Sequence, residues 1–99
     1  MLKIADWDCV KDHGCAPDKN GVDQPPDCQT DYKDYHKADT LEKCQNWALM
    51  QCKANTVSFA WEDESCMGFT HGCKYGEKDY YDYYDNELDF CKIKGNLLV

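Results

Sequence analysis

The stretch TLEKCQNWALMQC, residues 40–52, has the hydrophobic spacing of an amphipathic helix and carries two cysteines. At about 100° per residue, four side chains fall within one stripe about 80° wide: Leu41, Cys44, Ala48 and Cys52. Asp39 or Thr40 is placed to cap the start of this helix, and Asn55 is placed to end it. The sequence therefore predicts a helix that turns both cysteines toward the interior of the protein.

The hydrophobic period changes directly after this helix. TVSFAW, residues 56–61, alternates large apolar residues with smaller ones, which is typical of a half-buried strand. The polar residues 62–65 follow as a turn, and CMGF, residues 66–69, begins a returning strand. Because Cys66 arrives beside the strand that the helix must cover, we expect it to bond to Cys44. Closing a loop of about twenty residues stabilises a domain by about 3 kcal/mol in the chain-entropy model.

A closing strand is expected at FCKIK, residues 90–94, where alternation puts Cys91 and Ile93 on one face. A bond from Cys91 to an N-terminal cysteine would then join the two ends of the domain. Together with the helix and the hairpin, this strand predicts a largely buried core, with Trp47 or Trp61 at least partly buried. The core residues are Leu41, Ala48, Val57, Phe59 and Ile93.

Residues 1–38 are polar and rich in turn formers, among them Asn20-Gly21 and Pro25-Pro26. We expect a long loop held down by cystines, in which DWDCV, residues 6–10, forms a short edge strand. The 99 residues are enough for one domain, residues 1–99, and contain no convincing internal repeat.

Eight cysteines in so short a chain are typical of a disulfide framework formed in an oxidising compartment. We expect all of them to be paired: Cys9, Cys15, Cys28, Cys44, Cys52, Cys66, Cys73 and Cys91. The N-terminal residues lack the long apolar run of a signal peptide, so we expect a segment removed from this chain to direct secretion. The predicted location is extracellular.

Zinc is the alternative use of these cysteines. His-Gly-Cys occurs twice, at 13–15 and 71–73, and the two copies together could supply a Cys₂His₂ site. The paired C-x₂-C spacing that structural zinc sites favour is absent from the sequence. Disulfides therefore remain the favoured interpretation, and no metal ligands are predicted.

The formal charge of −8, without a single arginine, excludes several classes of partner. Nucleic acids and heparin-like polyanions need clustered cations, and arginine above all. No apolar run approaches the roughly 20 residues of a membrane span. No nucleophile–base motif is visible either. We therefore expect a protein that is not an enzyme, carries no cofactor, binds no nucleic acid and has no membrane span.

The acidic segment EKDYYDYYDNELD, residues 77–89, holds six acids and one lysine. Exposed tyrosines beside aspartates provide rigid contact area and orienting polar groups for a protein or a sugar. The segment could equally be a solvated edge strand or loop, and its tyrosines could be sulfated. Clustered aspartates could also hold Ca²⁺, although their spacing is not that of an EF-hand. The predicted ligand-binding residues are Asp79, Tyr80, Tyr81, Asp82, Tyr83, Tyr84 and Asp85.

Residues 40–67 resemble the core of the PAN/apple domain, with a capped helix that opens Leu-Glu-x-Cys, a strand that contains Phe, and a Cys after a short hairpin. The WSC module is a weaker match, since CMGF has Met where that family has Cys. The PAN/apple resemblance implies an α+β, disulfide-rich fold with one central helix packed on a curved antiparallel sheet. It also implies binding to proteins or carbohydrates without catalysis.

The resemblance also implies two disulfides, Cys44–Cys66 and a terminal bridge from Cys91 to Cys9 or Cys15. The chain departs from the family pattern because Ala48 and Thr56 stand where a further helix–strand pair of cysteines is usual. Three cysteines are extra, namely Cys28, Cys52 and Cys73. We expect Cys52 and Cys73 to hold loops in place, with a bond between the two as one arrangement.

Two classes of function remain. The favoured one is a secreted recognition module that binds an extracellular protein or glycan through the acidic tyrosines or the concave face of the sheet. The alternative is an acidic structural, adhesive or mineral-associated matrix protein rich in Tyr and Asp. Repeats and low complexity would favour the matrix protein, and this chain has neither.

Overall fold

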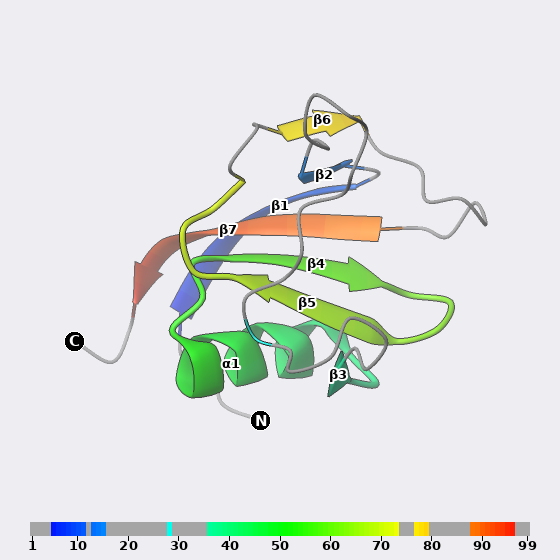
Figure 1. The fold of residues 1–99 in the computed structure, drawn as a ribbon, viewed down its shortest axis with the longest axis horizontal. Helices are drawn as coiled ribbons and strands as arrows, with labels where there is room; N and C mark the ends of the chain where they lie inside the picture. Colours follow the sequence, from blue (N-terminus) through cyan, green and yellow to red (C-terminus); the bar gives the residue numbers. More distant parts are fainter. Residues whose placement is uncertain are drawn as a thin grey trace.

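One helix packs on a five-stranded antiparallel sheet, which is the α+β arrangement that the sequence predicted (Figure 1). The computed structural model describes residues 5–11, 13–15, 28, 36–73, 77–79 and 88–96. The strand order is β1-β7-β4-β5-β3, and β2 and β6 form a separate two-stranded ribbon. In chain order the elements are β1 (Ala5–Lys11), β2 (His13–Cys15), β3 (His36–Lys37), α1 (Leu41–Cys52), β4 (Thr56–Ala60), β5 (Ser65–Phe69), β6 (Glu77–Asp79) and β7 (Leu88–Asn96).

The N-terminus of α1 is capped as predicted, by Thr40. Its hydroxyl accepts a hydrogen bond from the backbone N–H of Lys43 at 3.1 Å. The predicted terminator Asn55 is wrong by two residues, because Lys53 takes the left-handed conformation with φ 55°. Asn55 instead joins the sheet. Its N–H donates to the carbonyl of Phe69 at 3.1 Å, and its carbonyl accepts from the N–H of Ile93 at 2.9 Å.

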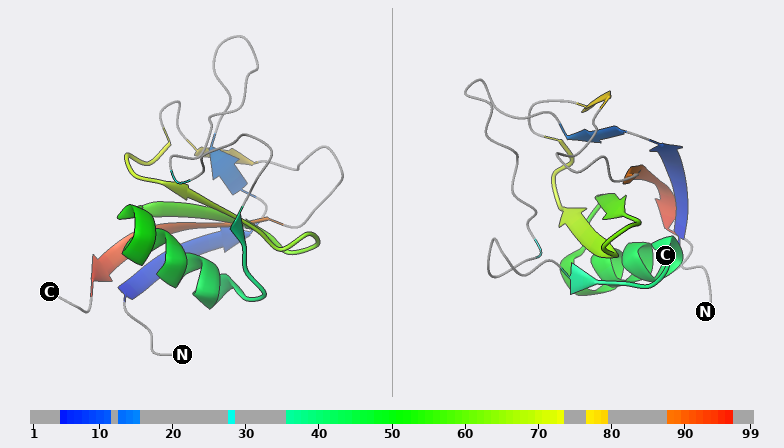
Figure 2. Two further views of the ribbon diagram at one scale, coloured as in Figure 1. Left: turned by 60° about the horizontal axis from the view of Figure 1, so that its bottom comes forward. Right: turned by 90° about the vertical axis from the view of Figure 1, so that its right-hand side faces the viewer.

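The helix lies on the concave side of the sheet, which curves around it (Figure 2). The helix face that the sequence predicted to be buried does face the core, since Cys44 and Ala48 are fully buried against Val57 and Phe59. Close approach depends on Gly68 of β5. A Cβ there would lie 3.2 Å from the Cβ of Ala54 and 3.3 Å from that of Ala48. Small residues on both elements therefore allow the helix to pack tightly onto β5.

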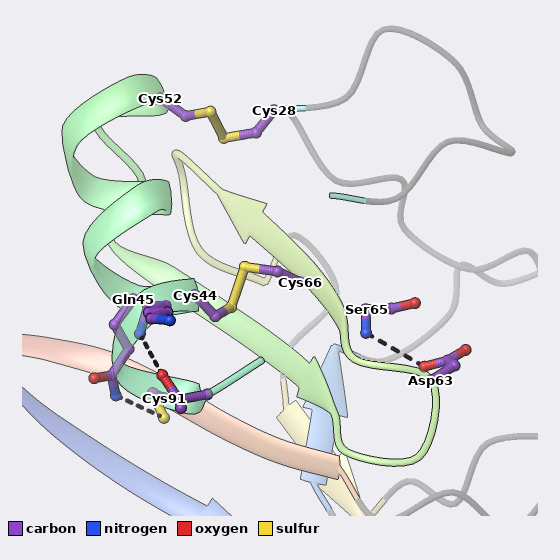
Figure 3. The surroundings of a disulfide bond; sticks show 10 residues. Cys28, Cys44, Gln45, Cys52, Asp63, Ser65, Cys66 and Cys91 are labelled. Carbon is purple, nitrogen blue, oxygen red and sulfur yellow. Dashed lines mark hydrogen bonds between the residues drawn. A yellow bond between two sulfur atoms is a disulfide. The ribbon is translucent and has the colours of Figure 1, made fainter. Parts of the chain in front are cut away.

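Three disulfides join described residues. Figure 3 shows two of them, Cys28–Cys52 and Cys44–Cys66. Cys44–Cys66 ties α1 to β5, as predicted. Cys9–Cys91 ties β1 to β7 across a sequence separation of 82, which confirms the predicted closure of the domain. In the same strand pair Ala5 lies opposite Asn96, so the described chain ends are neighbours.

The third bridge corrects one expectation. Cys52, at the end of α1, bonds to Cys28 and therefore not to Cys73. Cys73 is disulfide-bonded as well, and none of the described cysteines is free. The second turn of α1 also covers the terminal bridge, since the Gln45 side-chain amide donates to the sulfur atoms of both Cys9 and Cys91 at 3.4 Å.

The prediction of a half-buried β4 is wrong, because both faces of this central strand are buried. Thr56, Ser58 and Ala60 point away from α1, yet each is at most 5% exposed. Gly72 lies against the Thr56 side chain, and the β2–β6 ribbon lies on this side of the sheet (Figure 2). The far face therefore carries a second layer, which a local hydrophobic pattern does not reveal.

The remaining predictions concern the N-terminal strand and the burial of core side chains. The edge strand near Cys9 is confirmed as β1, although it is longer than predicted and the expected N-terminal loop also contributes β2 and β3. Of the predicted core residues, Ala48, Val57 and Phe59 are fully buried, and Leu41 and Ile93 are partly buried. Trp47 is partly buried, as predicted. Trp61 is 43% exposed.

Candidate functional site

The predicted acidic tyrosine site falls mostly outside the described residues. Asp79 belongs to β6, where it pairs with His13 of β2 in antiparallel register. Residues 80–85 lie outside the described part of the chain. The assignment of residues 79–85 as a contact surface therefore stays a prediction.

No group of three or more potential metal ligands occurs among the residues that the structure describes. The zinc alternative needed the Cys73 sulfur as a ligand, and that sulfur is in a disulfide. A disulfide sulfur is not a thiolate and does not hold zinc in a structural site, so this alternative loses one of its four ligands.

Large exposed hydrophobic side chains offer another route to a binding surface. Within the described ranges these are Val10 at 44%, Met50 at 60% and Trp61 at 43% exposed. Met50 is a flexible side chain on the solvent side of α1, and Val10 lies on the edge strand β1. Trp61 differs because its ring is held by two specific contacts.

The first contact is a hydrogen bond. The indole Nε1–H of Trp61 donates to Oδ2 of Asp89 at 2.7 Å, and Asp89 is only 7% exposed. The second contact is with Phe59, whose ring forms a T-shaped pair with the indole, with the ring centroids 4.9 Å apart and an interplanar angle of 80°. Both partners belong to central strands, so the rigid sheet fixes the orientation of the exposed indole.

The turn that carries Trp61 is itself well defined. Residues 61–64 connect β4 to β5, and Ala60 pairs with Ser65 at the base of the hairpin. Glu64 adopts a left-handed conformation with φ 58°, and the backbone N–H of Ser65 donates to Oδ1 of Asp63 at 3.3 Å (Figure 3). Such local bonds favour one turn geometry over others.

A lysine from a neighbouring strand supports the base of the hairpin. The Nζ of Lys37 in β3 donates to the carbonyl of Asp63 at 2.9 Å and to the hydroxyl of Ser65 at 3.1 Å. The backbone N–H of Ala38 also donates to the carbonyl of Glu64 at 3.0 Å. The turn is thus tied to the β3 edge as well as to its own strands.

The surface formed by Trp61, Glu62, Asp63 and Glu64 is called the hairpin surface below. All four residues are exposed, and three of them are acids. A fixed indole beside carboxylates presents an aromatic face together with hydrogen-bond acceptors. This combination suits contact with a flat, hydroxyl-rich or cationic group of a partner.

A second aromatic pair lies between β3 and α1. The rings of His36 and Trp47 stack at 3.9 Å with an interplanar angle of 1°. Burial lowers the pKa of His36 below its ordinary value of 6.5. Nearby, a hydrogen bond from Lys43 lowers the pKa of the exposed Asp39 carboxyl. This pair links the short β3 edge to the helix, so we regard it as part of the scaffold.

A hollow of about 400 Å³ lies at the opposite end of β4 from the hairpin. The Thr56 hydroxyl in its wall donates to the side-chain oxygen of Asn55 at 3.0 Å, so these two groups already partner each other. The residues around the hollow are Asn55, Thr56, Gly72, Cys73, Phe90, Lys92 and Ile93. Because its polar lining is partly engaged internally, the hollow is a weaker candidate than the hairpin surface.

Sequence reasoning did not assign Trp61 to the site. Its alternation with Phe59 predicted a strand residue facing the core, whereas the chain leaves the strand at Ala60. A tryptophan directly before three acids is a visible signal that the strand ends there. Asp89 was grouped with the solvated acids of residues 77–89, and it proves to be buried.

Comparisons with protein-family models, curated proteins and solved structures find no match to this chain. The PAN/apple resemblance therefore rests on residues 40–67 themselves, and membership of that family stays a proposal. The described part of the chain holds no helix with the length and hydrophobicity needed to cross a membrane.

Proposed function

We propose that this protein is a secreted, non-catalytic recognition module, related to PAN/apple domains, that binds an extracellular protein or carbohydrate partner. The observation that carries the proposal is the exposed Trp61 indole, held by Asp89 and Phe59 on a disulfide-linked scaffold. Tryptophan is among the residues that contribute most energy at interfaces. An indole already fixed in place loses little conformational entropy when it binds.

Three further features support the proposal. The disulfides Cys9–Cys91, Cys28–Cys52 and Cys44–Cys66 suit an oxidising extracellular environment. The helix occupies the concave face of the sheet, so that face is not free to bind a partner. The hairpin surface, at the tip of the sheet, is open to solvent. We infer that contact with a partner centres on this tip.

The test uses the oxidised full chain on an array of defined glycans and an array of purified extracellular proteins. Specific binding to at least one component is expected, together with its loss by tenfold or more in Trp61→Ala, since central aromatic anchors contribute at least about 1.4 kcal/mol. Met50→Ala removes a side chain that is 60% exposed and serves as the control, which should bind normally.

The matrix alternative makes a different prediction for the same variants. A mineral-associated acidic protein would be retained on hydroxyapatite through its net charge of −8, whether or not Trp61 is present. Retention on mineral without binding to either array would reject the recognition module and favour the matrix protein.

A further inference from the structure

The electrostatic environment of Trp61 narrows the class of ligand. Its Nε1–H is bonded to a buried carboxylate, that of Asp89, at 2.7 Å. A hydrogen bond to an ionised acceptor polarises the donor, which leaves additional electron density on the indole ring. Because a tryptophan face attracts cations through its ring quadrupole, this bond strengthens the attraction.

The next three residues of the turn act in the same direction. Glu62, Asp63 and Glu64 are exposed acids that follow Trp61 directly. Two lysines lie near this group. Lys37 is bonded to the carbonyl of Asp63 and to Ser65 at the base of the hairpin, and Lys11 lies opposite Asp89 in the β1–β7 register.

Among the described residues of this region the balance stays acidic with both lysines included, since there are four carboxylates and two ammonium groups. The whole chain carries −8. An anionic sugar, sulfated or uronic, would be repelled by this field, and a neutral sugar has no net charge for the field to attract. A cation would be attracted by the field from a distance and by the ring at contact.

We propose that the hairpin surface binds a basic side chain, an arginine guanidinium or a lysine ammonium, on an extracellular protein partner, with the cation over the exposed face of Trp61. This inference rests on the recognition function proposed above and chooses the protein partner over the glycan. Arginine fits best, because its planar group stacks on an indole while its N–H groups donate to the carboxylates of the turn.

The experiment uses the oxidised full chain and two capped peptides of glycine and two arginines, one of them with citrulline in place of each arginine. Citrulline keeps the planar shape and loses the charge. The readout is the indole N–H resonance of Trp61, identified by its absence in Trp61→Phe. A saturable shift is expected with the arginine peptide, with affinity about tenfold above that for the citrulline peptide and falling as salt is raised.

Three variants test whether arginine binding depends on the Trp61 ring and on the hydrogen bond that polarises it. Trp61→Leu should weaken arginine binding about three- to tenfold, measured from the peptide's own resonances, while Met50→Ala leaves it unchanged. Asp89→Asn keeps an oxygen acceptor for the indole and removes the charge, so it tests the inference in a folded hairpin. We expect it to weaken binding about twofold.

Equal affinity for the two peptides, or arginine binding that Trp61→Leu does not change, would overturn the cation inference. If a partner on the arrays binds through Trp61 but neither peptide binds, the cation inference is rejected and the proposed recognition function is retained. If nothing on the arrays binds and neither peptide binds, both proposals are rejected.

Discussion

The helix-covered face of the sheet includes strand β4, and the hairpin surface follows directly after this strand, but the two regions are held in different ways. Under α1, Phe59 is fully buried and the Cys44–Cys66 bridge crosses from helix to sheet. At the hairpin, Trp61 keeps 43% of its surface in solvent and depends on one hydrogen bond and one ring contact. Substitutions under the helix should therefore appear mainly in stability, and substitutions at the hairpin mainly in binding.

The largest effect is expected from Phe59→Ala. Removing a fully buried phenylalanine should lower the free energy of unfolding by about 3–5 kcal/mol, because transfer energy is lost and a cavity remains. Urea denaturation measures the loss, and Met50→Ala should change it by no more than about 0.5 kcal/mol. A loss below about 1 kcal/mol for Phe59→Ala would contradict the full burial of this side chain.

Removal of the helix–sheet bridge should rank next. The double variant Cys44→Ala, Cys66→Ala should lose about 3 kcal/mol, because the two residues close a loop with a sequence separation of 22. Denaturation under non-reducing conditions measures the difference from the parent protein. A loss as small as that of an exposed substitution would show that packing alone holds α1 on β5.

Trp61→Leu is expected to cost less than either, about 1–2 kcal/mol. The cost arises because the buried Asp89 carboxylate loses the N–H that satisfies it. A double-mutant cycle with Asp89→Ala, which removes the acceptor, measures the coupling between the two side chains by denaturation. Additive losses in that cycle would mean that the hydrogen bond does not hold the indole, and the comparison between the two regions would lose its basis.

Two non-glycine residues in the described part of the chain are left-handed, and they provide a matched pair, one in each region. Lys53 ends α1 with φ 55°, and Glu64 lies in the hairpin turn with φ 58°. Replacing either by glycine should raise stability by about 0.5 kcal/mol, because the strain relieved exceeds the added entropy of the unfolded chain. Thermal melts of the two variants measure the gain. Lys53→Ala is the control, since alanine keeps the strain and should bring no gain.

The smallest effect concerns pH and the stacked pair His36–Trp47. Burial lowers the pKa of His36 in the folded state, so the unfolded chain binds a proton more readily. The contribution of His36 to stability should be complete above the unfolded pKa of 6.5 and should decline as the pH falls from there to the lowered folded value. His36→Asn should remove this dependence in denaturation curves taken across the window. A rise in stability on acidification would instead show that stacking on Trp47 stabilises the imidazolium.

The helix and its bridges could be predicted because their signals are local. The period of residues 40–52 identified the buried stripe, and the strand that follows brought Cys66 to the same face. Cys91 could be assigned to an N-terminal partner because alternation in the last strand turned it inward. The partner of Cys52 could not be predicted, because Cys28 lies in a region whose sequence has no hydrophobic period to fix its position.

The candidate site was less accessible to sequence reasoning. Alternation placed Trp61 on the same face as Phe59, and the two rings do touch. Whether that position is covered depends on where the strand ends and on how far α1 reaches. Asp89 looked like one solvated acid among six, and its burial follows from its place on a central strand opposite Phe59.

The sequence by itself determined the disulfide-rich α+β class, the start of the helix, its buried stripe and the Cys44–Cys66 bridge. These depend on spacing within about thirty residues, where the period of side chains is set by backbone geometry. Tertiary structure alone decided that both faces of β4 are buried, that Cys28 reaches Cys52, and that Trp61 is fixed yet exposed. Those outcomes depend on segments that are distant in sequence but lie on the same surface. The hydrophobic period within one segment does not predict such contacts.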